Sequence, residues 1–384
     1  MKKSESIFTR DLLLIFAASF CYMCCPIMVT PVIPGFTESL GGGGFLMGFM
    51  GGLMNLVSLA CRPLVGNLAD RIQKYHLALA GALLLLLSNV GYLISYSPTA
   101  LFISRIFSGV GFASCSVSMS TWFSVLLPKN KIGFGMGLYG TAQAFSMAIA
   151  PAIGIRLKDA FGYRAVFIFA IALAFAAFIC ALLVKDHGHP VALSAPRRLQ
   201  VIDVRVLPIA MIVMLFTLPY SATQSFLVSF VEASQRTVQI DLFFPSYAVM
   251  LFALRTGFRN YFDRLPYRIF LFIALLCSAS ASLTLSWMQN NFHMFLGAAF
   301  LAGSYGLICS VSQATAIIIA GEGKRGLANS TYYVGLDLGL ALGPILGGML
   351  YESVDLAFFY PTFLLCPILC ILVYLCFRKN IDVV

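Results

Sequence analysis

The chain has 384 residues, of which 60% are hydrophobic and only 10% are charged, and its formal net charge is +10. Soluble domains carry roughly 25% charged residues, so this composition excludes a soluble enzyme or a soluble binding module. A lipid bilayer must surround most of the exterior, and spans of roughly 20 apolar residues are expected to recur.

Apolar segments recur about twelve times, which is enough for a polytopic helical membrane protein. Most connections between them are short and leave no room for a soluble domain. The eighth segment is the shortest and contains Pro245; it is either a proline-interrupted segment that lines a transport path or an ordinary tilted or kinked helix. The spans are expected at 11–33, 44–65, 77–96, 99–127, 133–155, 163–184, 206–231, 241–257, 268–288, 292–320, 327–350 and 356–377.

The positive charges are distributed unevenly between the two sides. If the N-terminus is cytoplasmic, about 20 of the 25 Lys and Arg residues fall in cytoplasmic segments, which is the positive-inside asymmetry. Both termini are therefore expected in the cytoplasm of a cell that carries the protein in its plasma or inner membrane. The basic excess is an orientation signal, so no nucleic-acid partner is expected. The basic residues expected on the outer side of the membrane are Arg156, Lys158, Arg164 and Arg236. Arg105 lies within a span.

One Asp-Arg pair occurs twice, about half a chain length apart, at Asp70-Arg71 and Asp263-Arg264, each expected in a short loop. The same offset carries Arg62 onto Arg255. This repeat predicts two similar halves, 1–184 and 206–384, joined by a cytoplasmic linker at 185–205. Two-fold internal repeats are typical of secondary transporters.

Residues 66–74, Gly-Asn-Leu-Ala-Asp-Arg-Ile-Gln-Lys, resemble the signature loop between helices 2 and 3 of the major facilitator superfamily, with Gln73 where that family usually has glycine. Residues 105–111 are similar to its helix 4 pattern, and 339–348 resemble its antiporter motif, although that motif belongs in helix 5. The resemblance implies an all-α fold of twelve transmembrane helices in two pseudo-symmetric six-helix bundles, alternating access, and the drug or metabolite:proton antiporter branch.

The same resemblance assigns a cytoplasmic gate to the repeated loops. A carboxylate near a helix N-terminus is stabilised by roughly 0.3–1 kcal/mol when exposed, enough to bias a balanced two-state equilibrium. The alternative is a charge pair that only sets topology. The gate residues are Gly66, Asp70, Arg71, Asp263 and Arg264.

Asp337 and Arg105 lie well inside spans, where a charge costs at least about 2.5 kcal/mol. Asp337 is the first candidate for proton coupling, because burial disfavours the charged form of a carboxyl group and lets it load and release a proton. Arg105, through the helix 4 resemblance, is a candidate for proton coupling or for binding an anionic group. The alternatives are a structural carboxylate at Asp337 and a snorkelling arginine at Arg105.

Glycines and prolines in the fifth and eleventh spans predict helices that pack closely and flex. Glycine bares a helix face so that a neighbouring backbone can approach, and proline removes an amide donor. Stability alone would also favour small residues there. The candidates are Pro151, Gly154, Gly339, Gly343, Pro344 and Gly347.

Polar and aromatic side chains within spans are candidate substrate contacts, each weighed against ordinary packing. The interior of the first span carries no Asp or Glu, which favours neutral, amphipathic or anionic substrates over cations. The candidates are Tyr22, Asn55, Trp122, Gln143, Tyr220, Gln224, Gln313 and Tyr332.

Together these features predict a secondary transporter, functional as a monomer, that exports small amphipathic organic molecules in exchange for protons. The alternatives are a symporter or facilitator for uptake of an organic solute or metabolite, and a non-transporting membrane receptor or scaffold. The chain has no phosphate-binding loop and no base-activated nucleophile, so neither an enzyme, a cofactor nor a metal site is expected. Its partners are the substrate, protons and the lipid bilayer.

Overall fold

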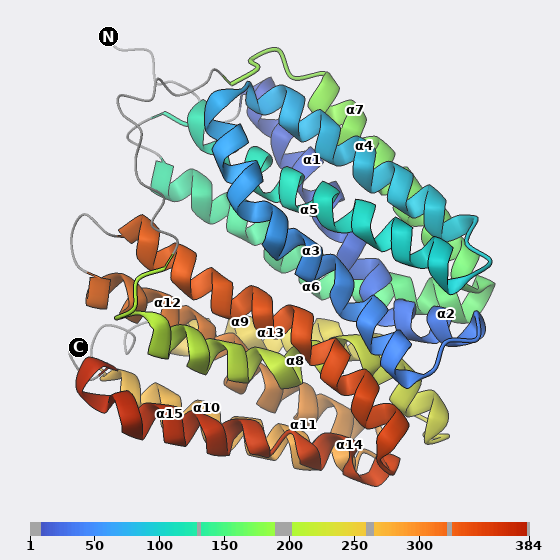
Figure 1. Cartoon of the computed structure of the whole chain (residues 1–384), viewed down its shortest axis with the longest axis vertical. Coiled ribbons are helices and arrows are strands. Elements are labelled where there is room, and N and C mark those ends of the chain that lie inside the picture. Colours follow the sequence, from blue (N-terminus) through green and yellow to red (C-terminus); the bar gives the residue numbers. More distant parts are fainter. Residues whose placement is uncertain (1–8, 129–131, 189–201, 259–264, 321–324, 382–384) are drawn as a thin grey trace. The chain divides into compact units, whose positions relative to one another are not determined.

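The computed structural model describes residues 9–128, 132–188, 202–258, 265–320 and 325–381 (Figure 1). Side chains at 67, 69–71, 132–138, 140–141, 144, 325–327 and 329 also fall outside its description. The described residues are helical, with short connections. The helices are α1 (Arg10–Val29), η1 (Thr30–Val32), α2 (Ile33–Ser39), α3 (Gly44–Arg71), α4 (Lys74–Leu93), α5 (Pro98–Leu126), α6 (Ile132–Phe161), α7 (Tyr163–Leu182), α8 (Leu207–Ala233), η3 (Ile240–Leu242), α9 (Phe243–Gly257), α10 (Tyr267–Ser286), α11 (Asn291–Leu301), η4 (Ala302–Gly306), α12 (Leu307–Ala320), α13 (Arg325–Ser353), α14 (Leu356–Thr362) and α15 (Leu365–Ile381).

Each of the twelve expected spans corresponds to a helical segment, when α1–η1–α2, α11–η4–α12 and α14–α15 are each taken as one segment. Ten of these segments are long and apolar enough to cross a membrane, counted over the described residues. The all-helical membrane fold is therefore confirmed. Several helices are longer than expected, because hydropathy detects only the part of a helix that lies in lipid.

One expected loop is wrong. The sequence predicts the Asp70-Arg71 pair in a connection, but α3 continues through Arg71, and Gln73 precedes the first residue of α4. The pair thus occupies the last helical turn. Polar residues can extend a helix past the apolar window because each further residue adds one backbone hydrogen bond.

The short eighth segment has no kink caused by proline. Its single turn of 3-10 helix, η3, leads into α9, and Pro245 falls within the first turn of that helix. An amide at that position has no intrahelical acceptor in any case, so proline removes nothing there.

The chain divides into two compact units. The first comprises residues 1–32 and 56–196, and the second comprises 33–55 and 197–384. Helix α3 contributes its first part to the second unit and its remainder to the first. Residues 33–55, expected in the first half, therefore pack with the C-terminal helices.

In the first unit, α4 packs along α5, and α1 packs along α7. Glycines permit the closest approach: a Cβ atom added at Gly111 would lie 2.9 Å from the carbonyl oxygen of Gly81. Beneath this contact lies a core that includes Tyr22, Trp122 and Phe123, all at most 1% exposed. Small residues between helices are how membrane bundles bring backbones together.

In the second unit, α8 is the central helix. Nearly all its residues from Pro208 to Val231 are buried, as expected for a helix that is apolar on every side. Its main neighbour is α13, and these two helices lie side by side in Figure 1. Helix α15 packs on α8 as well.

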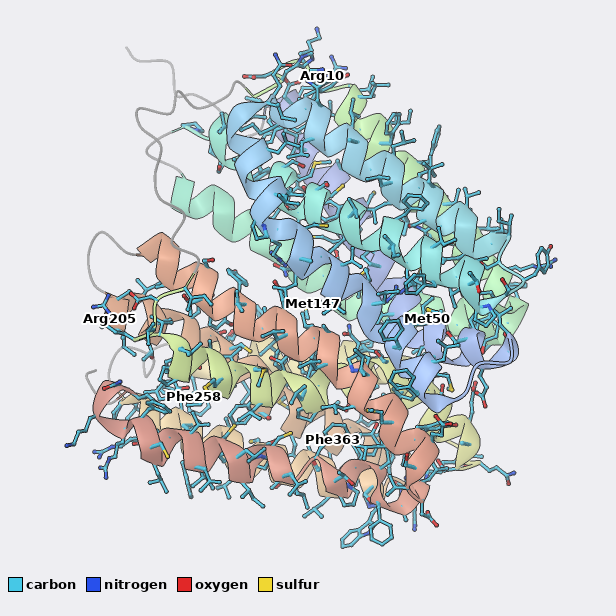
Figure 2. All side chains as sticks on the ribbon, in the orientation of Figure 1. Arg10, Met50, Met147, Arg205, Phe258 and Phe363 are labelled. Carbon is cyan, nitrogen blue, oxygen red and sulfur yellow. The ribbon has the colours of Figure 1, made fainter. Side chains whose placement is uncertain are left out.

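Large apolar side chains cover the outer faces of both units. On α15 they recur at helical spacing and project outward from the ribbon (Figure 2). A surface of this kind matches lipid rather than water, and it is what a multi-pass membrane protein requires. The exposed residues of α15 are Leu365, Ile368, Leu369, Ile371, Leu372, Leu375 and Phe377.

Both described ends of the expected linker are docked on their own unit. On the first unit, the Gly188 carbonyl accepts from the Lys74 amide at 3.3 Å, and the His187 ring stacks on Tyr75 at 4.1 Å. On the second unit, Arg205 pairs with Asp203 at 2.7 Å and donates to the Ala320 carbonyl at the end of α12. Asp203 raises the pKa of Arg205 by hydrogen bonding and by its charge.

Candidate functional site

The candidate site is built around α13, whose glycines form a bare face toward α8. A Cβ atom added at Gly339 would lie 2.5 Å from Cβ of Thr217, and one at Gly343 would lie 2.5 Å from the carbonyl oxygen of Leu218. Ser221 Oγ uses this approach to donate to the Gly339 carbonyl at 2.8 Å. The residues of this face recur every fourth position, at Gly335, Gly339, Gly343 and Gly347.

A second face of α13 meets the first part of α3 within the same unit. The two helices run antiparallel, since Gly48 lies against Gly348 and Gly52 against Ala341. A Cβ atom at Gly48 would lie 2.8 Å from the Gly348 Cα and would clash with the carbonyl oxygen of Pro344. At the end of this contact, Glu352 Oε2 accepts the Phe45 amide of the first turn of α3 at 2.8 Å.

Pro344 explains the position of Asn55. Proline has no amide hydrogen, so the carbonyl four residues earlier, that of Leu340, loses its intrahelical donor. Asn55 Nδ2 donates to this carbonyl at 3.3 Å, as neighbouring helices do for freed backbone groups in membranes. Asn55 therefore has a structural role in this conformation, in addition to its expected place among the substrate contacts.

Asp337 lies near the middle of α13 and is 4% exposed. By helical periodicity it shares the face of Ala341 and Pro344, one turn earlier. The Asp337 carboxyl group therefore lies on the same face of α13 that contacts α3 at Ala341 and Pro344. A side chain that exchanges a proton during transport is expected in such a buried position between helices.

Arg105 belongs to the first unit and is 0% exposed, about two turns into α5. Its side chain does not extend to the surface of the unit, so its guanidinium group is buried. Serines recur along the same helix, and Ser104 and Ser108 are also buried.

The gate residues are only partly described. Gly66 lies in α3 with open space around it, since no atom falls within 4 Å of an added Cβ. Asp70 and Arg71 end α3, but their side chains lie outside the description, as do Asp263 and Arg264 entirely. The gate therefore stays a prediction.

Pro151 and Gly154 lie in α6, where Gly154 contacts Met28 near the end of α1. Pro151 is buried, and a Cβ atom at Gly154 would lie 2.8 Å from Cγ of Met28. The glycine is needed here for close packing of α6 on α1.

Candidate substrate contacts in the first unit are divided among different environments. Tyr22 is 1% exposed, and its hydroxyl lies 3.1 Å from that of Tyr139. Trp122 is 0% exposed and donates from Nε1 to the Asp186 carbonyl at 2.7 Å, so it anchors the chain that follows α7. Gln143 is exposed on α6.

Replacing Trp122 by phenylalanine is expected to lower the free energy of unfolding by about 1–2 kcal/mol, because the Asp186 carbonyl loses its donor, while flux is retained. Thermal unfolding and flux of the purified variant measure this. The control is Trp287→Phe, at a tryptophan that is 72% exposed, which should change neither. Loss of substrate binding at unchanged stability would show instead that Trp122 is a substrate contact.

In the second unit, two candidates, Tyr332 and Gln313, take part in hydrogen bonds between α12 and α13. The Tyr332 hydroxyl donates to the Cys309 carbonyl at 3.0 Å, and Gln313 donates to the hydroxyl of Tyr333, whose ring lies 5.2 Å from that of Tyr332. Tyr220 lies on α8 and is 3% exposed. Gln224 is half-buried on α8.

Sequence reasoning missed two aromatic neighbours of Tyr220. Tyr305 stacks on it with ring centroids 3.9 Å apart, and the Tyr247 ring lies at 5.6 Å. Tyr305 lies on η4, a five-residue π-helix between α11 and α12. The glycines that flank it, Gly303 and Gly306, were the available signal, since paired glycines within an apolar span indicate close packing.

The sequence is similar to membrane transport proteins along its length. A profile of the Major Facilitator Superfamily matches residues 15–259 and 233–382. An uncharacterized MFS-type transporter of Burkholderia pseudomallei is 26% identical over 388 residues, covering 94% of this chain and 90% of that protein. Another, from Methanocaldococcus jannaschii, is 24% identical over 160 residues, and this match spans only 42% of either protein.

Solved structures share the fold at low sequence identity. A bacterial homologue of the human lysosomal transporter Spinster, inward-facing and unoccupied, matches with a TM-score of 0.78 at 14% identity, covering 99% of this chain and 98% of its own. A POT family transporter in complex with a thioalcohol-conjugated peptide matches with a TM-score of 0.80 at 12% identity, covering 97% and 96%. The nucleoside transporter NupG matches with a TM-score of 0.79 at 12% identity, covering 96% and 99%.

Proposed function

This chain belongs to the major facilitator superfamily of secondary transporters, and on that premise we propose that it exports small amphipathic organic molecules in exchange for protons. The observation that carries the proposal is Asp337, a carboxyl group 4% exposed in the middle of a membrane-spanning helix. A buried carboxyl group can take up a proton on one side of the membrane and release it on the other.

The packing of α13 supports the same proposal. A helix that is bare on the α8 side and meets α3 through glycines on another face can shift against a neighbour without losing large side-chain contacts. Asp337 lies on this helix, so protonation and helix movement are mechanically connected. Alternating access requires such a connection between the coupling ion and the moving element.

The first experiment measures proton movement in sealed proteoliposomes that contain the purified protein, against a panel of anionic, neutral and cationic organic compounds. We expect a substrate-dependent pH change whose sign, at known protein orientation, corresponds to antiport. The opposite sign would establish a symporter for uptake, and flux without proton movement would establish a facilitator. Specific binding without any flux would favour a receptor or scaffold.

A further inference from the structure

The second unit contains a buried hydroxyl that has no hydrogen-bond partner within the described residues. Tyr247 on α9 is 3% exposed, and its hydroxyl oxygen is buried and unpaired. Leaving such a group unsatisfied costs free energy, and an unsatisfied polar atom in a native protein calls for an explanation, such as a ligand that is missing. The hydroxyl lies beside η4, at 3.1 Å from a Cβ atom added at Gly306.

Next to this hydroxyl is an aromatic surface. Tyr220 and Tyr305 stack with an interplanar angle of 14°, and the Tyr247 ring lies at 39° to Tyr220. Rings in this arrangement receive a further flat ring by offset stacking or edge contact. The three rings come from three helical segments that are distant in the chain, α8, α9 and η4.

The backbone at Tyr305 is the least regular in this part of the unit. Segment η4 is a π-helix, and π segments within α-helices are frequent at functional sites. Its Ser304 hydroxyl is also buried and unpaired in the described structure. A one-residue change of register in this segment would turn Tyr305 by about 100° around the helix axis, which separates the stacked rings and admits a ligand.

The neighbouring charged group on α9 is positive. Arg255 lies about two turns after Tyr247 on α9 and donates to Ser310 Oγ at 2.9 Å, one turn after Gly306. A cation would be repelled by this guanidinium, whereas an anion would be attracted. A hydroxyl that donates to a carboxylate forms a charge-assisted hydrogen bond, which is stronger than a neutral one.

We propose that Tyr220, Tyr247 and Tyr305 form a binding site for aromatic carboxylates, with the ligand ring on the tyrosine rings and its carboxylate accepting from the Tyr247 hydroxyl on the Arg255 side. This proposal rests on the proposed transport function and names the class of substrate for it. The site selects a flat ring by stacking and a negative charge by the hydroxyl and the guanidinium.

The test is equilibrium binding of 1-naphthoate to the purified full-length protein in nanodiscs, without a pH gradient. We expect 1-naphthoate to bind more tightly than 1-naphthamide, and 1-naphthylmethylamine to bind weakest. Tyr247→Phe should weaken 1-naphthoate binding roughly tenfold or more and should leave 1-naphthamide binding less affected, because only the carboxylate makes the charge-assisted bond.

The matched control is Tyr267→Phe. Tyr267 is 2% exposed in the same unit, but its hydroxyl lies 3.0 Å from Ser312 Oγ. This variant should lose thermal stability and keep 1-naphthoate affinity, whereas Tyr247→Phe should keep stability and lose affinity. Tyr305→Leu, which removes one of the stacked rings, should weaken 1-naphthoate binding.

The proposal is overturned if 1-naphthoate shows no preference over 1-naphthamide or if Tyr247→Phe binds it as tightly as the parent protein does. These outcomes are separate from failure of the transport function. Aromatic carboxylate binding with no export would uphold the site and refute efflux. Export that is unaffected by Tyr247→Phe would refute the site and uphold efflux.

Discussion

Replacing Asp337 by asparagine is expected to reduce proton-driven flux by roughly a hundredfold or more, while substrate binding remains measurable. Asparagine has the size of aspartate but cannot take up and release a proton. Asp337 is buried in α13, so the neutral amide should be tolerated at this position. Substrate–substrate exchange, which moves no net proton, should survive in the variant. Proteoliposomes with and without an imposed pH gradient distinguish the two activities.

The control for this change is Asp355→Asn. Asp355 is exposed before α14, where its carboxylate accepts the Ala357 amide at 2.9 Å, and asparagine can replace it as a helix cap. The variant removes one negative charge from the same unit and should transport normally. Full proton coupling in Asp337→Asn would refute the proposed role. Loss of exchange together with coupling would indicate a structural carboxylate instead.

Replacing Gly343 by alanine is expected to lower the free energy of unfolding by about 3 kcal/mol and to abolish most of the flux. The added methyl group would clash with Ser221 Oγ and would lie 2.5 Å from the Leu218 carbonyl oxygen. Neither α8 nor α13 can move away cheaply, because Ser221 also bonds to the Gly339 carbonyl across this contact. Thermal unfolding in detergent and flux in proteoliposomes measure the two effects.

The control is Gly66→Ala on α3. An added Cβ there meets no atom within 4 Å, and alanine is favoured over glycine in a helix interior by up to about 1 kcal/mol. Stability should therefore hold or rise. If Gly343→Ala were as stable as Gly66→Ala, the α8–α13 contact would be looser than the structure describes, and the close-packing argument for α13 would fail.

Several features could be predicted from the sequence because their causes are local. Apolar runs of spanning length predict each of the twelve helical segments, since the bilayer requires every backbone group to be bonded within its own helix. The four-residue spacing of Gly339, Gly343 and Gly347 predicts a bare helix face. Asp337 is recognisable as a buried carboxyl group because it lies within an apolar run.

Other features follow only from contacts between distant segments. Which helix would fill each glycine face could not be read from spacing, and neither could the partner of Asn55, which depends on a carbonyl freed by Pro344. The end of α3 beyond the lipid-facing window is decided by backbone hydrogen bonds rather than by hydropathy.

The membrane class, the number of spans and the candidate coupling carboxyl group were thus determined by the sequence alone, through hydrophobic length and helical period. The tertiary structure alone decided that Trp122 holds the Asp186 carbonyl and that Tyr247 and Tyr305 lie beside Tyr220. The physical reason is that side-chain partners are set by how helices pack, and helix packing brings together residues that no local pattern connects.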